Sequence, residues 1–298
     1  MMRAILAVAL CAGFASTSEA GQGVAWDSWS GSDSEGTATH RLGATWQVER
    51  RDAAHWWGLN GEHARYRGSD WRIDETRLFV RGAGGGERWR WSGRLGSNGE
   101  TWIGDATLYS TRAARSEFFI ERDRLDTRNG ALQGRYQTFA GAAQDWPVHP
   151  RVTLAGVAGL QDFTGGNRRT HLRGTASFTL SDELGIATQL RTRWFKDSAP
   201  ERADYFAPGE YSEVLGTLVL TRRVQGLRAR VVLGAGERQV RGGGREPARL
   251  AEGLLETPEW REGLRFRLRI GYSDAPQAAA VGPGYRYRYV GVDGSLPL

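Results

Sequence analysis

Residues 264–272 read LRFRLRIGY, and this regular alternation of apolar and arginine side chains decides the fold. Successive side chains of an extended strand point to opposite faces, so a period of two is the signature of a β-strand. The apolar residues of this stretch therefore share one face, and Arg265, Arg267 and Arg269 share the other. The stretch predicts a strand with one apolar and one strongly charged face.

Similar alternating runs recur along the chain, separated by turn signals such as Asn98-Gly99 and Asn129-Gly130. No long helical period is found after Gly21. The runs predict strands at 39–50, 55–67, 71–82, 88–97, 102–111, 115–123, 131–141, 151–162, 168–180, 184–196, 211–223, 227–240, 262–273 and 285–293. Residues 247–257 stay undecided between strand and loop.

The length and the ends of these runs distinguish between two all-β classes. Most runs have ten to thirteen residues, whereas strands of soluble proteins average about 5–6 and a tilted membrane strand needs about 9–11. Tryptophans stand near many run ends, for example Trp46, Trp71, Trp102 and Trp194, as in the aromatic girdles of membrane barrels. We therefore predict an antiparallel transmembrane β-barrel of 14–16 strands, in preference to a secreted β-sandwich or lectin-like domain.

Composition excludes several other classes. Apolar residues make up 40% of the 298 residues without any run of about 20, which excludes a polytopic helical membrane protein. Aromatic residues reach 10%, which argues against disorder. The single cysteine, Cys11, excludes a disulfide framework. The formal net charge is +6, and its basic residues alternate along strands rather than forming a run, so nucleic acid is not an expected partner.

The N-terminus is typical of a secretory signal peptide. Arg3 precedes an apolar stretch, and Ser18 and Ala20 are small residues in the −3 and −1 positions of a cleavage site before Gly21. We expect residues 1–20 to be removed near Ala20, residues 21–38 to form an N-terminal arm, and residues 39–298 to form the barrel. The expected location is the outer membrane of a Gram-negative cell.

The arginines decide which face of each strand is turned inward. An arginine facing hydrocarbon costs about 2–4 kcal/mol at the membrane midplane, so the charged face should line the lumen. The expected pore-lining residues are Arg88, Arg90, Arg94, Arg173, Arg191, Arg193, Arg228, Arg230, Arg265, Arg267, Arg269, Arg286 and Arg288. A basic lumen attracts anions. Alternatively, arginines and carboxylates pair across the lumen and plug it.

Two segments are more specific than the alternation. LQDFTGGNRR at 160–169 closes one run and opens the next, and DYFAPGEY follows at 204–211. This pairing resembles the C-terminal β-barrel of exopolysaccharide-export outer-membrane porins of the poly-N-acetylglucosamine and cellulose type, without the tetratricopeptide region that precedes the barrel in that family. The resemblance implies a barrel of sixteen strands, which we favour, and a polysaccharide chain as partner.

The same two segments supply the candidate loop or rim residues. These are Asn167, Arg168, Arg169, Tyr205, Phe206, Pro208 and Tyr211. Pro208 fixes the backbone of the second segment. The residues allow two interpretations, a turn that merely packs or an aromatic rim that contacts sugar.

Motifs for chemistry are not found. The five histidines do not form H-E-x-x-H, no G-x-S-x-G occurs, and no histidine or cysteine cluster suits a metal. We predict no catalytic residue, no metal and no cofactor. Three functions stay open: a pore that assists export of an anionic or neutral exopolysaccharide, a closed structural or accessory barrel of an envelope assembly, and a barrel enzyme. Outer-membrane lipids are expected partners, and periplasmic scaffold or synthase components are candidates.

Overall fold

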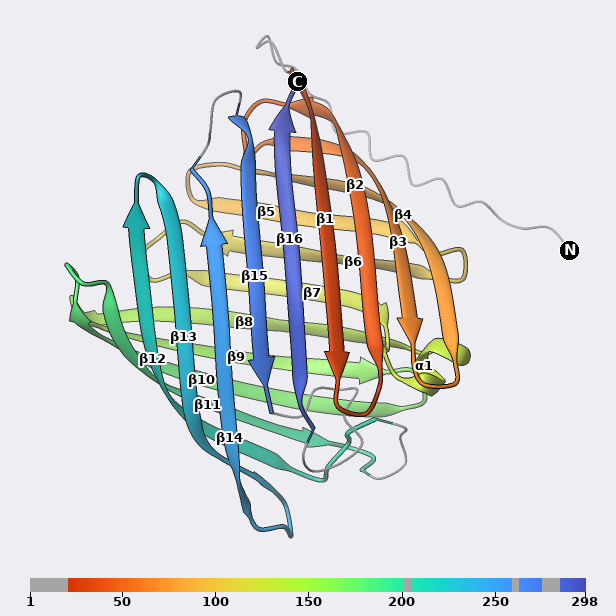
Figure 1. The fold of residues 1–298 in the computed structure, drawn as a ribbon, viewed down its shortest axis with the longest axis vertical. Coiled ribbons are helices and arrows are strands. Elements are labelled where there is room, and N and C mark those ends of the chain that lie inside the picture. Colours follow the sequence, from red (N-terminus) through yellow and green to blue (C-terminus); the bar gives the residue numbers. More distant parts are fainter. Residues whose placement is uncertain (1–20, 201–204, 259–262, 275–284) are drawn as a thin grey trace, which may run out of the picture.

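The computed structural model describes residues 21–200, 205–258, 263–274 and 285–298. Sixteen antiparallel strands form one closed barrel in which each strand pairs with the next in sequence and the last pairs with the first (Figure 1). Closure satisfies the backbone hydrogen-bonding groups of every strand, which hydrocarbon demands. The predicted transmembrane barrel of sixteen strands is confirmed. The expected signal peptide, residues 1–20, lies outside the described residues.

In the described part of the chain, the barrel contains one short helix besides the strands. Its elements are β1 (Gly21–Asp33), β2 (Ala38–Arg50), β3 (Trp56–Arg67), β4 (Arg72–Gly85), β5 (Trp89–Ser97), β6 (Trp102–Ser110), β7 (Ser116–Arg124), α1 (Arg128–Leu132), β8 (Tyr136–His149), β9 (Val152–Phe163), β10 (Asn167–Ser181), β11 (Ile186–Asp197), β12 (Tyr211–Val224), β13 (Leu227–Val240), β14 (Arg245–Glu256), β15 (Arg265–Ser273) and β16 (Tyr287–Pro297).

The prediction of an N-terminal arm at residues 21–38 is wrong. Most of this segment forms β1, which closes the barrel between β16 and β2. Its sequence GQGVAWDSWSGSD shows no clear alternation because its inward positions are small or paired. Gly31 leaves room for the ring of Tyr287, and Asp27 pairs with Arg81 at 3.1 Å. The undecided segment 247–257 lies mostly in β14.

The two ends of the barrel differ in their connections. The start of β1 and the end of β16 lie together at the top of Figure 1. Two-residue turns at 150–151 and 225–226 lie at this end, whereas the longer connection 125–135 lies at the other. Outer-membrane barrels have short periplasmic turns and longer external loops. We therefore call the end with the termini the periplasmic end and the opposite end the external end.

The lipid face and the lumen have opposite chemistry. Large apolar side chains point outward around the barrel, including Leu42, Leu59, Leu78, Leu218 and Leu233, with Leu78 67% exposed. Buried polar and charged side chains point inward. Within the described ranges, no helix is long and apolar enough to span a membrane. The apolar belt on the strands is therefore the surface that meets lipid.

The inward and outward positions of β15 can be tested directly. Leu268 faces lipid opposite Val292, and Arg267 faces the lumen, where its Nε lies 2.9 Å from Glu256 Oε1. We expect Leu268→Arg to block folding into bilayers, because a lipid-facing arginine costs about 2–4 kcal/mol near the midplane. Arg267→Leu should be mild, since Glu256 keeps Arg228 at 3.1 Å. The faster migration of unboiled protein on a denaturing gel reports folding. Equal damage from both changes would contradict this orientation.

Candidate functional site

The periplasmic half of the lumen holds a cavity of about 1550 Å³. Its lining includes eleven arginines but only five carboxylates, so the cavity wall carries a clear excess of positive charge. The arginines come from strands all around the barrel: Arg41, Arg50, Arg81, Arg90, Arg94, Arg115, Arg223, Arg228, Arg265, Arg267 and Arg269. Such a wall raises the local concentration of anions at the periplasmic mouth.

The carboxylates of this cavity are already engaged. Asp27, Glu62, Asp105, Glu256 and Asp293 each lie within 3.1 Å of an arginine nitrogen. Two further arginines of the wall, Arg41 and Arg115, pair with Asp123 and Glu117, which lie outside this lining. The positive excess is a property of the cavity as a whole.

A second cavity, of about 580 Å³, lies further along the lumen beside β10, β11 and β16. Arg173, Arg191 and Arg193 line it, and so do three tyrosines of the β16 segment. Trp29 lines both cavities, so they adjoin at this side chain. A sequence of aromatic rings runs from it: Trp29 stacks on Tyr289 at 4.6 Å, followed by Tyr287 and Tyr285 at ring spacings of 6.1 and 6.5 Å. We call these four residues the aromatic ladder.

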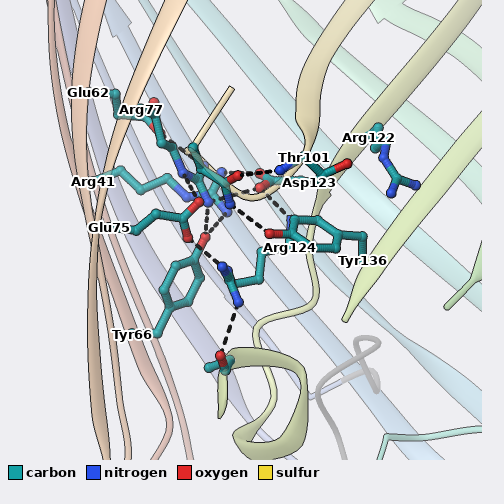
Figure 2. A network of polar contacts seen from close by, with 12 residues as sticks. Arg41, Glu62, Tyr66, Glu75, Arg77, Thr101, Arg122, Asp123, Arg124 and Tyr136 are labelled. Carbon is teal, nitrogen blue, oxygen red and sulfur yellow. Dashed lines mark hydrogen bonds and ion pairs between the residues drawn. The ribbon is translucent and has the colours of Figure 1, made fainter. Parts of the chain in front are cut away.

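A network of buried charges fills the lumen on the side of β2 to β7 (Figure 2). At its centre Arg77 is fully buried and reaches Glu62 at 3.0 Å, Glu75 at 3.2 Å and Asp123 at 3.0 Å, and it donates to the Tyr66 hydroxyl. A buried ion is tolerated only when it is paired and hydrogen-bonded, and here three carboxylates surround one guanidinium. The centre of the network is therefore fully occupied.

Two further arginines extend the network and fasten α1 (Figure 2). Arg41 lies 2.8 Å from Asp123, and Arg124 lies 2.8 Å from Glu75. Arg124 also donates to the Ala131 carbonyl at 3.0 Å, which ties α1 into the lumen. Ala131 packs on Tyr66 and its neighbours in a small apolar cluster. This side of the lumen is consequently closed by fixed side chains.

The structure places most of the expected pore-lining arginines in the lumen. Those on the inner face are Arg90, Arg94, Arg173, Arg191, Arg193, Arg228, Arg230, Arg265, Arg267 and Arg269. They fall in two groups, around the periplasmic cavity and along the second cavity.

Three of these expectations are wrong. Arg88 lies in the turn between β4 and β5, and Arg286 precedes β16. Arg288 lies on the lipid face, because Tyr287 and Tyr289 of the same strand line the second cavity. Alternation of tyrosine with arginine does not define the inner face, since a tyrosine can line a lumen and an arginine near a strand end can reach the polar headgroups.

The loop candidates pack together at the external end. Asn167 Nδ2 donates to Asp197 Oδ1 at 2.8 Å and to the Tyr205 hydroxyl at 2.9 Å, and Arg169 Nε donates to the same carboxylate at 3.0 Å. Tyr205 stacks on Phe163 at 4.4 Å and is 6% exposed.

Most of the remaining loop candidates are also packed against neighbouring side chains. Tyr211 stacks on Phe195 at 4.7 Å, Phe206 meets both rings edge-on, and Pro208 is buried. Arg168 alone is exposed. These rings pack on one another, as expected for the packed turn, and contact of this segment with sugar stays a prediction.

Sequence reasoning missed the buried network and the aromatic ladder. Glu75 and Arg77 are two residues apart and so share a face, a signal that was present in the sequence. Their partners come from β3 and β7, which no local pattern brings together. Within the described ranges, no group of three metal-ligating side chains converges.

Comparisons with known proteins place the fold. No family profile and no curated protein sequence matches the chain. Among solved structures, a bacterial polysaccharide outer membrane secretin has a TM-score of 0.67 at 11% identity, over 93% of this chain and 98% of that chain. OprD of Pseudomonas aeruginosa has a TM-score of 0.45 at 11% identity, over 94% and 96% of the two chains. The likeness to the secretin shows the fold, a closed barrel of the outer-membrane type.

The network makes a specific prediction about stability. We expect Arg77→Ala to lower the free energy of unfolding by about 3–5 kcal/mol, because it leaves buried carboxylates without their counter-ion. Arg90→Ala is the matched control, since Arg90 lines the cavity and forms no ion pair with any described residue. Urea unfolding in lipid, followed by tryptophan fluorescence, measures both. A loss of similar size in the two variants would contradict a structural role for the network.

A histidine at the periplasmic mouth gives a pH prediction. In the turn before β3, His55 Nδ1 lies 2.9 Å from Asp52 Oδ2, and His55 Nε2 lies 3.0 Å from the Gly85 carbonyl oxygen. The hydrogen bond to Asp52, helped by that carbonyl, raises the pKa of His55 above its usual value, and the same bond lowers the pKa of Asp52. The stabilisation is fully present below the unfolded pKa of about 6.5 and is lost as pH rises through the folded pKa.

NMR titration of the His55 ring can test this arrangement. We expect a pKa above about 6.5 in the wild type and a lower value in Asp52→Asn, because the charged acceptor is gone. An unchanged His55 titration in the variant would show that the carboxylate does not hold the proton.

Proposed function

We propose that this protein is an outer-membrane pore that assists export of an acidic exopolysaccharide out of the periplasm. The observation that carries the proposal is the arginine excess of the large cavity at the periplasmic end. A polymer leaving the cell meets this end first, so the electrostatic attraction acts where capture is needed.

The arginines suit a moving polyanion better than a fixed one. Each guanidinium offers five donors that can hold a carboxylate or sulfate with two of them. Many of the arginines are already shared with carboxylates, for example Arg267 with Glu256 and Arg269 with Asp293. Partial neutralisation weakens each site, and conduction requires many sites that bind and release.

The aromatic ladder supplies a surface for the sugar rings. The faces of Trp29, Tyr287 and Tyr289 are apolar and carry negative potential, so the C–H groups of a pyranose can pack on them, while the tyrosine hydroxyls offer hydrogen bonds. Tyr285 is only 1% exposed and offers no accessible face. The ladder begins at Trp29 in the large cavity and continues along β16 beside the second cavity. Arg173, Arg191 and Arg193 line the same second cavity. The arrangement provides both apolar and anionic contacts along one path.

The fold supports this proposal at the level of architecture. The structure with the TM-score of 0.67 is described as a bacterial polysaccharide outer membrane secretin. That description belongs to the other protein. Applied here, it makes a polysaccharide a reasonable choice among the anionic polymers that an arginine-lined barrel could pass.

A closed accessory barrel is the second candidate, and the buried network favours it. Arg41, Arg77 and Arg124 and their carboxylates occupy one side of the lumen. If the remaining side chains close the other side as well, the barrel would act as a structural part of an envelope assembly. Conductance separates the two candidates.

Single-channel recording in planar bilayers under a salt gradient tests the pore. We expect an anion-selective conductance, and a several-fold weaker anion selectivity for Arg90→Glu plus Arg223→Glu, because both residues line the periplasmic cavity. Arg168→Glu plus Arg245→Glu makes the same change in net charge at exposed positions of the external end. Added oligogalacturonate should block the current, and a neutral malto-oligosaccharide should not.

Three results would count against the proposal. Absence of any conductance in the wild type would favour the closed barrel. Equal loss of selectivity in both double variants would remove the role of the cavity. Equal block by the acidic and the neutral sugar would leave a polysaccharide pore without the preference for anions.

A further inference from the structure

A group of cations lies outside the barrel, on the lipid face at the external end of β2, β3 and β4. It consists of three arginines, Arg65, Arg67 and Arg72, with His40 and His63 beside them, and we call it the external cationic patch. The strand register brings these residues side by side. Arg67 lies opposite Arg72 on the next strand, and Arg65 lies between His40 on one neighbouring strand and Asp74 on the other. The residues between them, such as Ala64 and Tyr66, are buried on the inner side. The patch therefore faces away from the lumen and plays no part in lining it.

One carboxylate organises this patch. Asp74 accepts from Arg65 Nε at 2.7 Å and from Arg72 Nε at 2.5 Å, and His63 Nε2 lies 3.2 Å away. Both arginines use their Nε, so their terminal nitrogens extend beyond Asp74 and meet no hydrogen-bonding partner among the described residues. Arg67 likewise forms no ion pair within that part of the chain. Three arginines share one carboxylate, and the patch keeps a positive excess.

The apolar belt begins directly below the patch. Leu42 lies opposite His63 on the neighbouring strand. At the next outward-facing pair toward the middle of the barrel, Ala44 lies opposite Gly61, and Leu78 lies on the other side of Gly61. Leu42 is 62% exposed and Leu78 is 67% exposed. A ligand that bridges these two surfaces must combine anionic groups with hydrocarbon chains. An arginine at this level is tolerated, since the cost of a lipid-facing arginine falls to about 0–1 kcal/mol near the interface.

The same end of the barrel is different elsewhere on its circumference. On β9 and β10, Arg168 is matched by Asp162 at 3.5 Å, and on β13 and β14, Arg245 is matched by Glu237 at 3.2 Å. In both places one cation faces one carboxylate. The patch on β2 to β4, where three arginines share one carboxylate, therefore differs from these two places.

We propose that the external cationic patch binds the phosphorylated headgroup of a lipid in the outer leaflet. Guanidinium groups hold phosphate oxygens in pairs, and several neighbouring arginines can share more than one phosphate. The acyl chains of the same lipid would lie on Leu42 and Leu78. A free phosphate ion would use only the upper half of this surface, whereas a lipid uses both. The inference does not depend on the pore.

Native mass spectrometry of the folded, detergent-solubilised barrel tests this proposal. The probe is bisphosphorylated lipid A, compared with the same lipid after removal of its phosphates. We expect bound lipid A on the wild type and a several-fold lower occupancy on Arg65→Ala plus Arg67→Ala plus Arg72→Ala. The control, Arg168→Ala plus Arg245→Ala, should bind like the wild type. Heat modifiability confirms that each variant is folded.

Further variants keep the test decisive if the triple variant does not fold. Arg67→Ala alone removes a cation without breaking a described ion pair and should lower occupancy. Asp74→Asn removes the carboxylate that competes with phosphate and should keep or raise occupancy. Equal binding of the dephosphorylated lipid, equal loss in the control, or displacement of lipid A by millimolar inorganic phosphate alone would each overturn the proposal.

Discussion

The cost of placing a charged side chain in hydrocarbon is the constraint on which the rest of this structure depends. It is about 2–4 kcal/mol for an arginine at the membrane midplane and falls toward zero at the interface. Each strand must therefore turn one face outward and keep it apolar, and nearly every arginine of the middle rows must turn inward. Closure of the sheet follows from the same solvent, because an unpaired strand edge has no hydrogen-bonding partner in lipid.

The inward arginines bring positive charge into the lumen, and carboxylates neutralise this charge in one part of the lumen more completely than in another. Beside β2 to β7, carboxylates from several strands surround Arg77, Arg41 and Arg124 and neutralise them. At the periplasmic end, arginines outnumber the carboxylates of the cavity wall. A side that only had to be filled would be expected to approach neutrality, as the network does. The need to fill the lumen with side chains therefore does not explain the excess of arginine at the periplasmic end.

The fold was predictable because each strand has one face toward lipid and one toward the lumen, so apolar and polar residues alternate along its sequence. This holds for β15, where arginine alternates with Phe266, Leu268 and Ile270. It fails for β1, whose inward positions are occupied by Gly31 and Asp27, since a glycine that makes room for Tyr287 leaves no trace of alternation. It also fails at the start of β16, where Tyr287 and Tyr289 face the lumen and Arg288 faces lipid, so the alternation puts Arg288 on the wrong side. The long-range part of the network could not be predicted, because its pairs Arg41–Asp123, Arg77–Asp123 and Arg124–Glu75 join strands far apart in sequence.

The closed side of the lumen also defines where a polymer could travel. Arg77 and Arg124 are held by several ion pairs each, and Arg124 holds α1, so this side cannot open without separating buried charges. The two cavities adjoin at Trp29, and beyond it the path runs between the aromatic ladder and the arginines of β10 and β11. A chain moving there would keep its ring faces on tyrosine and its acidic groups toward arginine. The buried network would thus confine a polymer to the side of the lumen that the aromatic ladder and these arginines line.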